Sequence, residues 1–544
     1  MIQKTIILGG KIIDVVERRV FKGEISISYG IISNIEKKEN VPDVYILPGL
    51  IDSHIHIESS MLLPSEFAKI AVKHGTVATV SDTHEIANIL GIEGIDFMID
   101  DGNKVPFKFF FGAPSCVPST EFETSGASIS SREVGELLRR KDIYFLSEMM
   151  NYPGVIYNDT EVYKKIDLSK KLNKKIDGHA PGLKGVELKK YVKPGISTEH
   201  ECINEEEALE KIKYGMNIQI REGSAAKNFN ALYKIIDKYP DKVMFCTDDS
   251  HPDDLIKGHI DIFIRRGKAL GINIFNLLRA ASYNPVKHYG LNVGLLQPND
   301  PADMIVIKDL DAFKVEKTYI DGQLVYENGN VYFPDLKKKE INNFNRNAIL
   351  EKDLQVPAKT SKIHVIEVIN GELFTRKCIL NAKIENNFLY SDIDHDILKI
   401  VVVNRYKNAP PAIGFIKGFG LKKGALASSI AHDSHNIIAV GTNDQDLTSA
   451  INKIIEQKGG IVAACKNEIV ELRLEIGGIM STKNGFEIAN KYELLQKMAK
   501  EYGSPLKAPF MTLSFMALLV IPELKIGDKG LFDVNKFEFI SLFK

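Results

Sequence analysis

The chain contains the stretch Val44-Tyr45-Ile46-Leu47-Pro48-Gly49-Leu50-Ile51-Asp52-Ser53-His54-Ile55-His56. Its apolar residues predict a β-strand, and two histidines separated by one residue stand at the end of that strand. Side chains at positions i and i+2 of an extended backbone share a face, so His54 and His56 can point at one metal ion. The stretch therefore predicts a buried strand with metal ligands at its carboxyl end.

Seven further apolar strands follow at a regular spacing, and we place them at 76–81, 107–112, 144–147, 175–178, 195–198, 217–220 and 243–247. Helical patterns separate most of them, for example at 64–74, 132–141, 205–214 and 229–239. Alternating strands and helices are typical of parallel βα units, and eight units are the number that closes a (β/α)₈ barrel. The fold class is therefore predicted to be α/β, with a TIM-like barrel at residues 48–297.

Polar residues suited to catalysis follow nearly all of these strands. They are His54, His56, Asp82, His84, Glu85, Glu148, His179, His200, Arg221, Glu222, Asp248 and Asp249. The carboxyl ends of barrel strands meet on one face, where active sites are built. We therefore expect these side chains to converge on a single site.

Strand-rich segments flank the predicted barrel. Short β-branched runs at 5–10, 11–16, 24–28 and 31–35 alternate with glycine turns, and similar runs return at 302–307 and 315–326. We expect residues 1–47 and 298–335 to form one small β-sandwich domain. Residues 361–544 are predicted to form a separate α+β domain. Residues 335–352 are predicted to form a linker or a bridging helix.

Composition excludes several classes of protein. The 70 Lys and Arg residues balance 71 Asp and Glu residues, without an arginine-rich arm, so neither nucleic acid nor an anionic membrane is an expected partner. The five cysteines include no C-x-x-C pair, which favours reduced thiols over a disulfide framework. No signal-peptide pattern or membrane-length apolar run is present in the sequence, and we expect a cytoplasmic protein.

Four histidines and two carboxylates at the strand ends form a candidate metal centre. His54, His56, His179 and His200 offer imidazoles, Asp248 ends the eighth strand, and Glu148 is a second carboxylate able to bridge. Such a set suits two divalent ions such as Mn²⁺, Fe²⁺ or Zn²⁺. The alternative is that some of these histidines are structural residues beside glycines.

In combination these motifs resemble the adenine deaminase family of the amidohydrolase superfamily. The resemblance rests on residues 48–56 and on the segments 54–61, 82–88, 147–151, 178–181, 197–201, 221–224, 246–249, 432–436 and 509–515. It implies hydrolytic deamination of adenine to hypoxanthine and ammonia, in purine salvage, and a homodimer or larger homo-oligomer.

The resemblance also implies a ligand set. Two divalent ions, Mn²⁺ or Fe²⁺, are expected to be held by His54, His56, Glu148, His179, His200 and Asp248. Many relatives bridge their metals with a modified lysine on the fourth strand, and Glu148 stands there in this chain. Strand spacing leaves Asp248 and Asp249 open as ligands, because neighbours point to opposite faces, and we favour Asp248.

The chemistry predicted from these residues needs two proton carriers besides the activated water. Asp248 is expected to take a proton from the water and pass it to the leaving amine, and Glu85 to supply the ring proton. We expect a raised pKa for Glu85 in a closed cavity; its alternative role is at a helix N-terminus. Substrate contacts are expected from Asp82, Arg221, Glu222 and Ser224, with an internal Arg–Glu pair as the alternative.

Two other functions and one other cluster stay open. The same metal centre can hydrolyse a cyclic amide or a related heterocycle, and a barrel without catalysis can serve as a binding scaffold. Residues His432, Asp433 and His435 form a second cluster of ligand type. It can cap the barrel mouth, line the pocket, hold an extra ion, or lie in an ordinary surface turn.

Overall fold

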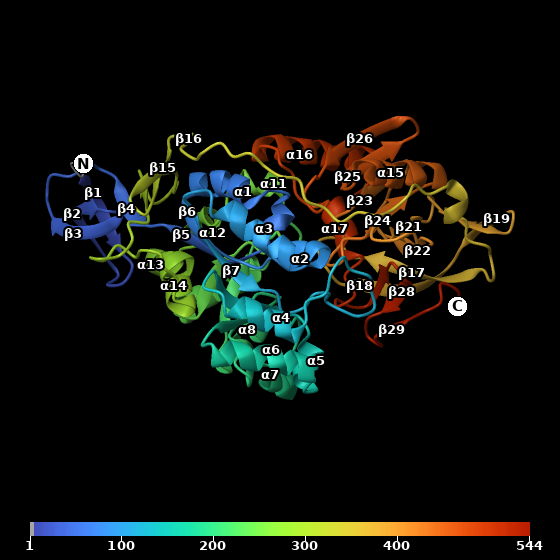
Figure 1. Ribbon diagram of the computed structural model, residues 1–544, viewed down its shortest axis with the longest axis horizontal. Helices are drawn as coiled ribbons and strands as arrows, with labels where there is room; N and C mark the ends of the chain where they lie inside the picture. Colours follow the sequence, from blue (N-terminus) through green and yellow to red (C-terminus); the bar gives the residue numbers. More distant parts are fainter. Residues whose placement is uncertain (1–4) are drawn as a thin grey trace.

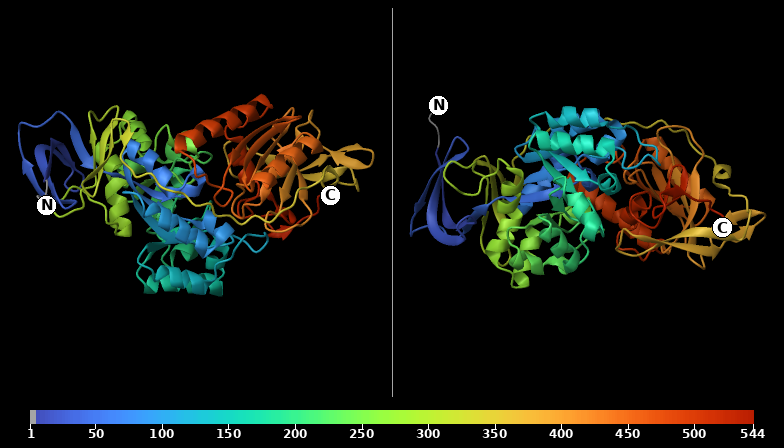
Figure 2. Two further views of the ribbon diagram at one scale, coloured as in Figure 1. Left: turned by 45° about the horizontal axis from the view of Figure 1, so that its top comes forward. Right: turned by 90° about the horizontal axis from the view of Figure 1, so that it is seen from below.

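The computed structural model describes residues 5–544 and consists of three parts arranged along its long axis (Figure 1). A strand-rich part containing the N-terminus lies at one end, the βα units lie in the middle, and the C-terminal part lies at the other end. Figure 2 shows the same order from two further directions. The C-terminal part therefore packs against the middle part and lies away from the N-terminal strands.

Eight parallel strands form the middle part. Five of them make one sheet, namely β5 (Leu50–Ile55), β6 (Thr76–Ser81), β7 (Lys108–Ala113), β8 (Ile143–Met149) and β9 (Lys175–Gly178). The other three are β10 (Thr198–Glu199), β11 (Asn217–Arg221) and β12 (Val243–Cys246). Single parallel bridges, Ile176 to Ile196 and Ile55 to Asp248, join the two sheets into a ring. The predicted α/β barrel is confirmed, with each strand within a few residues of its expected place.

Helices cover the outside of this ring. They are α1 (Pro64–Ala71), α2 (His84–Leu90), α3 (Ile92–Gly102), α4 (Ser131–Leu138), α5 (Tyr152–Ile156), α6 (Thr160–Lys171), α7 (Gly185–Val192), α8 (Glu205–Lys213), α9 (Phe229–Leu232), α10 (Lys234–Lys238), α11 (Pro252–Leu255), α12 (Asp261–Ala269), α13 (Ile274–Leu278) and α14 (Asn284–Tyr289). The helix predicted at 229–239 is divided in two at Tyr233. Pro64 begins α1 at a position where its missing N–H costs nothing, and Gly75, with φ +79°, ends the short 3₁₀ turn Val72–His74 that follows α1.

The two flanking β segments form one sheet of eight strands. Its order is β16 (Asn330–Val331), β15 (Gln323–Glu327), β14 (Val315–Ile320), β13 (Met304–Ile307), β4 (Tyr45–Pro48), β1 (Ile6–Asp14), β2 (Arg19–Ser28) and β3 (Ile31–Lys37). Strand β4 joins the two segments, because it pairs with β1 on one side and β13 on the other. The sheet therefore leads directly into β5 and the first two histidines.

One local prediction in this sheet is wrong. Gly9 and Gly10 do not make a turn, since β1 runs through them without interruption. A Cβ on Gly10 would lie 3.0 Å from the Val44 carbonyl oxygen. Glycine is needed there for the close approach of β4, not for a change of chain direction.

The C-terminal part contains a second sheet of eight strands. Its order is β18 (Thr375–Asn381), β17 (Lys362–Val368), β22 (Ala412–Lys417), β21 (Ile397–Val403), β24 (Ile437–Gly441), β23 (Ala425–Ser428), β25 (Gly460–Cys465) and β26 (Glu468–Arg473). Smaller sheets are β19 (Lys383–Glu385) with β20 (Phe388–Tyr390), and β27 (Leu524–Gly527), β28 (Gly530–Asp533) and β29 (Glu538–Phe539). The helices are α15 (Asp444–Gln457), α16 (Gly485–Glu501) and α17 (Pro509–Phe515).

The segment between barrel and C-terminal part is extended. Residues 332–350 contain neither helix nor strand, so of the two predictions for 335–352 the linker fits. The Asn343 side chain donates to the Ile89 carbonyl at 3.2 Å, and Lys338 donates to Glu66 and to the Thr482 carbonyl. These contacts tie the linker to both parts, which also share one continuous apolar core.

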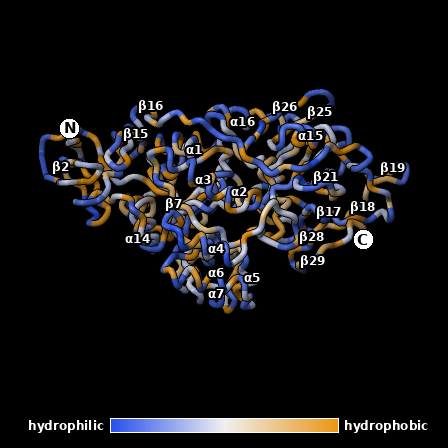
Figure 3. The backbone as a smooth tube through the Cα atoms, viewed as in Figure 1, coloured by the Kyte–Doolittle hydropathy of each residue, from blue (hydrophilic) through white to orange (hydrophobic). Residues whose placement is uncertain are grey.

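Hydrophilic and hydrophobic residues alternate over short distances along the chain (Figure 3). Over residues 5–544, no helix combines the length and the apolar character that crossing a membrane requires.

Candidate metal centre and active-site cavity

Glu148, near the end of β8, lies between the predicted histidine ligands. Its Oε1 is 3.2 Å from His56 Nε2, and its Oε2 is 2.7 Å from His179 Nδ1 and 3.4 Å from His200 Nε2. Burial raises the pKa of Glu148, but His179 and its neighbours lower it more, to well below its usual range. The ionised Glu148 carboxylate therefore directs Oε1 to His56 and Oε2 to His179 and His200, an arrangement that suits a ligand shared by two cations.

Asp248 contacts the same ring nitrogen of His56 as Glu148 does. Its Oδ1 lies 3.2 Å from His56 Nε2 and 3.5 Å from His54 Nε2. The Asp248 backbone has φ +56°, a left-handed conformation that is costly for a residue other than glycine and is often found at functional sites. The neighbouring Asp249 accepts a hydrogen bond from Ser59 Oγ at 2.5 Å instead. The structure thus places Asp248 rather than Asp249 against the His54 and His56 imidazoles.

The donor atoms of the six predicted ligands are buried imidazole nitrogens and carboxylate oxygens, which suit divalent cations. Both ring nitrogens of His54 and the Nδ1 of His200 are buried and, over residues 5–544, lack a hydrogen-bond partner. Burying unpaired polar atoms costs free energy, and cations at these atoms would remove that cost. Donor atoms of His54, His56 and Asp248 lie within 4.8 Å of one another, as do those of His54, Glu148 and His200. Imidazole and carboxylate donors suit Mn²⁺, Fe²⁺ and Zn²⁺.

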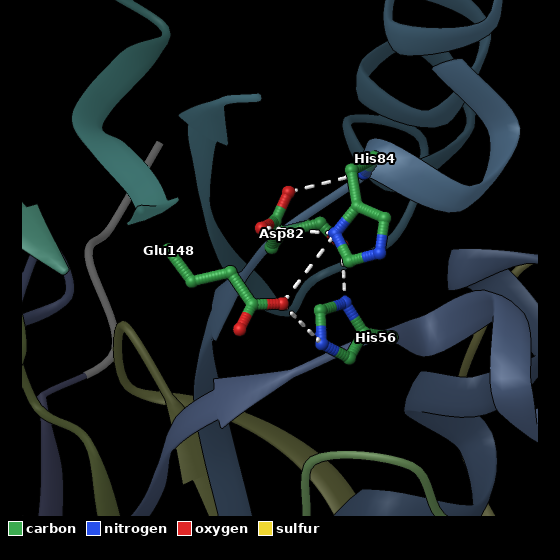
Figure 4. A group of neighbouring side chains, drawn as sticks. All are labelled: His56, Asp82, His84 and Glu148. Carbon is green, nitrogen blue, oxygen red and sulfur yellow. Dashed lines mark hydrogen bonds and ion pairs between the residues drawn. The ribbon is translucent and has the colours of Figure 1, made fainter. Parts of the chain in front are cut away.

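A neighbouring group contains Asp82 and His84 (Figure 4). His84 Nδ1 lies 3.2 Å from Asp82 Oδ2 and 3.6 Å from Glu148 Oε1, while Asp82 Oδ1 accepts the His84 backbone N–H. Asp82 is buried beside His84 and does not line the cavity. Asp82 therefore contacts His84, and the expectation that Asp82 contacts the substrate stays a prediction.

Arg221, at the end of β11, forms an internal ion pair. Its Nη1 lies 2.5 Å from both Asp248 Oδ2 and Glu201 Oε1, and its Nη2 lies 3.0 Å from Glu201 Oε2. All three side chains are buried. The alternative of an Arg–Glu pair is present, although the glutamate is Glu201 and not Glu222. Glu201 was not named as a site residue from the sequence, because the only signal for it was its position inside the motif 197–201.

Glu222 and Ser224 face away from this centre. Glu222 Oε2 pairs with Arg266 at 2.5 Å, and Ser224 Oγ donates to Asp254 Oδ2 at 2.8 Å. Neither residue lines the cavity that holds Arg221. Glu222 and Ser224 therefore contact other side chains just after the end of β11, and the expectation that they bind the substrate stays a prediction.

Glu85, the second residue of α2, meets the cluster of the C-terminal part. His432 Nδ1 lies 2.5 Å from Glu85 Oε1, and His435 Nε2 contacts Glu85 Oε2. Burial raises the pKa of Glu85, but His432, His435 and His84 lower it more, to well below its usual range. The expected raised pKa of Glu85 is wrong, because the contacts with His432, His435 and His84 outweigh the effect of burial. Of the open readings for His432, Asp433 and His435, capping the barrel mouth and lining the pocket both fit, whereas an ordinary surface turn does not, because all three residues are buried.

A small cavity lies over the centre. Its volume is about 30 Å³, and its walls combine the ligands with residues from the C-terminal part, namely Leu373, His432, Asp433, Phe515, Leu518 and Ile521. A space of this size holds water but not a heterocycle. The apolar wall was missed in the sequence, because only tertiary contact brings 373 and 515–521 to the barrel mouth.

Comparison with known proteins agrees with this site. The Amidohydrolase family matches residues 45–325, and the Adenine deaminase C-terminal domain matches residues 372–538. An adenine deaminase of Methanosarcina barkeri is 56% identical over 98% of this chain and 98% of its own length. Adenine deaminases of Sulfurovum sp. and Borreliella burgdorferi are 52% and 48% identical over 97% of this chain and 98% of theirs. With the barrel, the histidine and carboxylate centre and full-length similarity in agreement, the chain belongs to the adenine deaminase family of amidohydrolases.

Proposed function

We propose that this protein hydrolyses adenine to hypoxanthine and ammonia, as part of purine salvage. The observation that carries the proposal is the enclosed centre in which Glu148 lies between His56, His179 and His200 while Asp248 faces His54 and His56. Relatives that match nearly the whole chain bear the name adenine deaminase.

The ligands proposed for two divalent ions, Mn²⁺ or Fe²⁺, are His54, His56, Glu148, His179, His200 and Asp248. When bound, such ions supply Lewis-acid activation of water at neutral pH. The protein contributes the buried carboxylates that hold them and a cavity wall that excludes bulk water. The support is the donor set itself and the unpaired ring nitrogens of His54.

Proton transfer is assigned to two carboxylates. Asp248 accepts a proton at the attacking water and returns it to the departing amine, while Arg221 holds its second oxygen at 2.5 Å. Glu85, on the far side of the cavity, serves the ring nitrogen that gains a proton. Because Glu85 is itself ionised, the proton must reside on a partner of Glu85.

Substrate entry requires movement of the cavity wall. A neighbouring cavity of about 350 Å³ shares Glu201, Arg221, Leu373 and Ile521 with the small one. A shift of Leu373 and Ile521 would join the two and give a purine room. The free base is favoured over nucleotides, because the sequence contains no phosphate-binding glycine loop.

The second candidate is hydrolysis of a cyclic amide. The glutamate at position 148, in place of a modified lysine, favours the deaminase. The test is to incubate metal-replete protein with adenine and with a cyclic amide, and to follow ammonia release and the ultraviolet spectrum. Ammonia from adenine supports the proposal, and turnover of the cyclic amide alone contradicts it.

Three further proposals rest on the family resemblance and the sequence pattern. They are a homodimer or larger homo-oligomer, a cytoplasmic location, and domain limits at 1–47 with 298–335, 48–297 and 361–544.

A further inference from the structure

We propose that His432 is a catalytic residue that delivers the proton gained by the adenine ring. The C-terminal part of the chain places His432 in contact with Glu85 in the cavity wall. The inference rests on the proposed deamination and deepens it, since it assigns the ring proton to a residue outside the barrel. Glu85 then acts as the partner that holds the His432 imidazole.

The geometry joins two parts of the chain that are 347 residues apart. Glu85 Oε1 is 2.5 Å from His432 Nδ1, and both residues line the cavity. The His432 ring stacks on Phe515, with ring centroids 4.5 Å apart and an angle of 16° between the ring planes. Since Nδ1 is directed to Glu85, the opposite ring nitrogen, Nε2, is the one left for a ligand in the cavity.

Hydrogen bonding distinguishes the two histidines around Glu85. His435 Nδ1 accepts the Ala431 backbone N–H at 3.3 Å, so a neutral His435 carries its proton on Nε2, toward Glu85. Burial lowers the pKa of His435 to about 4. His435 therefore supports the Glu85 carboxylate without carrying a positive charge.

His432 is the member that holds the mobile proton. Burial lowers its pKa, but Glu85, followed by Asp249 and Asp433, raises it more, to about 9. The titratable groups that act on its charge are those three carboxylates and the imidazoles of His435 and His251. At neutral pH the pair is an imidazolium and a carboxylate, which is a proton source although Glu85 is ionised.

The reaction balances with this assignment. His432 Nε2–H gives its proton to a ring nitrogen of adenine as the oxygen of water bonds to C6. The bond from C6 to the amine then breaks, and the amine leaves as ammonia with one proton of the water. The second proton of the water returns to His432, which completes the cycle.

The test uses the full-length protein loaded with Mn²⁺ or Fe²⁺, and the variants His432→Gln and His395→Gln. His395 is exposed in the same part of the chain and serves as the matched control. We expect His432→Gln to lower kcat for adenine by roughly 10²- to 10³-fold with unchanged metal content, and added imidazole to restore part of the loss. His395→Gln should match the unmodified protein.

A pH profile of the unmodified protein gives an independent measurement. We expect kcat at saturating adenine to fall above pH 9 as His432 loses its proton. A His432→Gln variant with full kcat, or an unmodified protein with constant kcat up to pH 10, would overturn the inference. If the unmodified, metal-loaded protein releases no ammonia from adenine, the proposed function is contradicted. If the protein is active but His432→Gln has the same kcat, only the role of His432 is contradicted. Should His432→Gln not fold, the pH profile and imidazole rescue of His432→Ala decide.

Discussion

Arg221 fixes the orientation of Asp248, because its Nη1 lies 2.5 Å from Asp248 Oδ2 while Asp248 Oδ1 faces His54 and His56. The guanidinium also pairs with Glu201, so its position is set from two sides. Burial raises the pKa of Asp248, but Arg221 and the histidines lower it more, to well below its usual range. The pair keeps one carboxylate oxygen available to the centre.

We therefore predict that Arg221→Lys lowers kcat for adenine by about 10²-fold, because a lysine cannot hold Asp248 and Glu201 at once. The matched control is Arg266→Lys, which alters the pair with Glu222 outside the cavity. Steady-state kinetics on both variants provide the check. Equal kcat in the two variants would show that Arg221 does not position Asp248.

Glu148→Gln should reduce metal content and activity together, since a shared ligand loses its charge. Glu123→Gln is the control, because burial raises the pKa of Glu123 to about 8 and the amide then replaces a carboxyl that is already neutral. Elemental analysis and ammonia release on protein purified without chelators measure both effects. Full metal content with full turnover in Glu148→Gln would contradict a bridging role.

Glu85→Gln should lower kcat by roughly 10²- to 10⁴-fold while metal content stays constant. The amide cannot stabilise the His432 imidazolium, which then loses its proton. The double variant with His432→Gln should be little worse than either single variant, because residues that act as a unit are not additive. Loss of metal from Glu85→Gln would instead identify Glu85 as a ligand.

Much of the fold follows from local sequence patterns. The strands at 76–81 and 175–178 coincide with β6 and β9, because buried apolar runs and their neighbouring helices need only near neighbours to be recognised. The Gly9–Gly10 pair was misread, since glycine serves both turns and close strand contacts, and only the position of Val44 distinguishes them.

The site was predictable where strand geometry determines it. His54, Glu148 and His179 converge because parallel strands end on one face. The inward or outward direction of Arg221 and Glu222 depends on register, which spacing does not give. The contact between Glu85 and His432 depends on the docking of two parts of the chain, so the sequence showed the cluster at 432–435 without its partner.

Lys525, in β27, gives a prediction for stability. Its Nζ donates to the carbonyl oxygens of Leu373 and Phe515 at 2.8 and 3.0 Å, and both of those residues line the cavity. Burial lowers the pKa of Lys525 from 10.5 to about 7. Between pH 7 and 10.5 the unfolded chain therefore binds a proton at this lysine that the folded chain does not.

The sign of the effect follows from that difference. The cost of burying Lys525 is fully present below pH 7, and it diminishes as the pH rises toward 10.5, where both states are neutral. We expect the free energy of unfolding to rise with pH in this window by about 1.4 kcal/mol per pH unit more than in Lys525→Met. Urea denaturation at pH 7, 8 and 9 measures the slopes, with the exposed Lys529→Met as control. Parallel slopes in Lys525→Met and the unmodified protein would mean that Lys525 stays charged in the folded state, held by the two carbonyls it contacts.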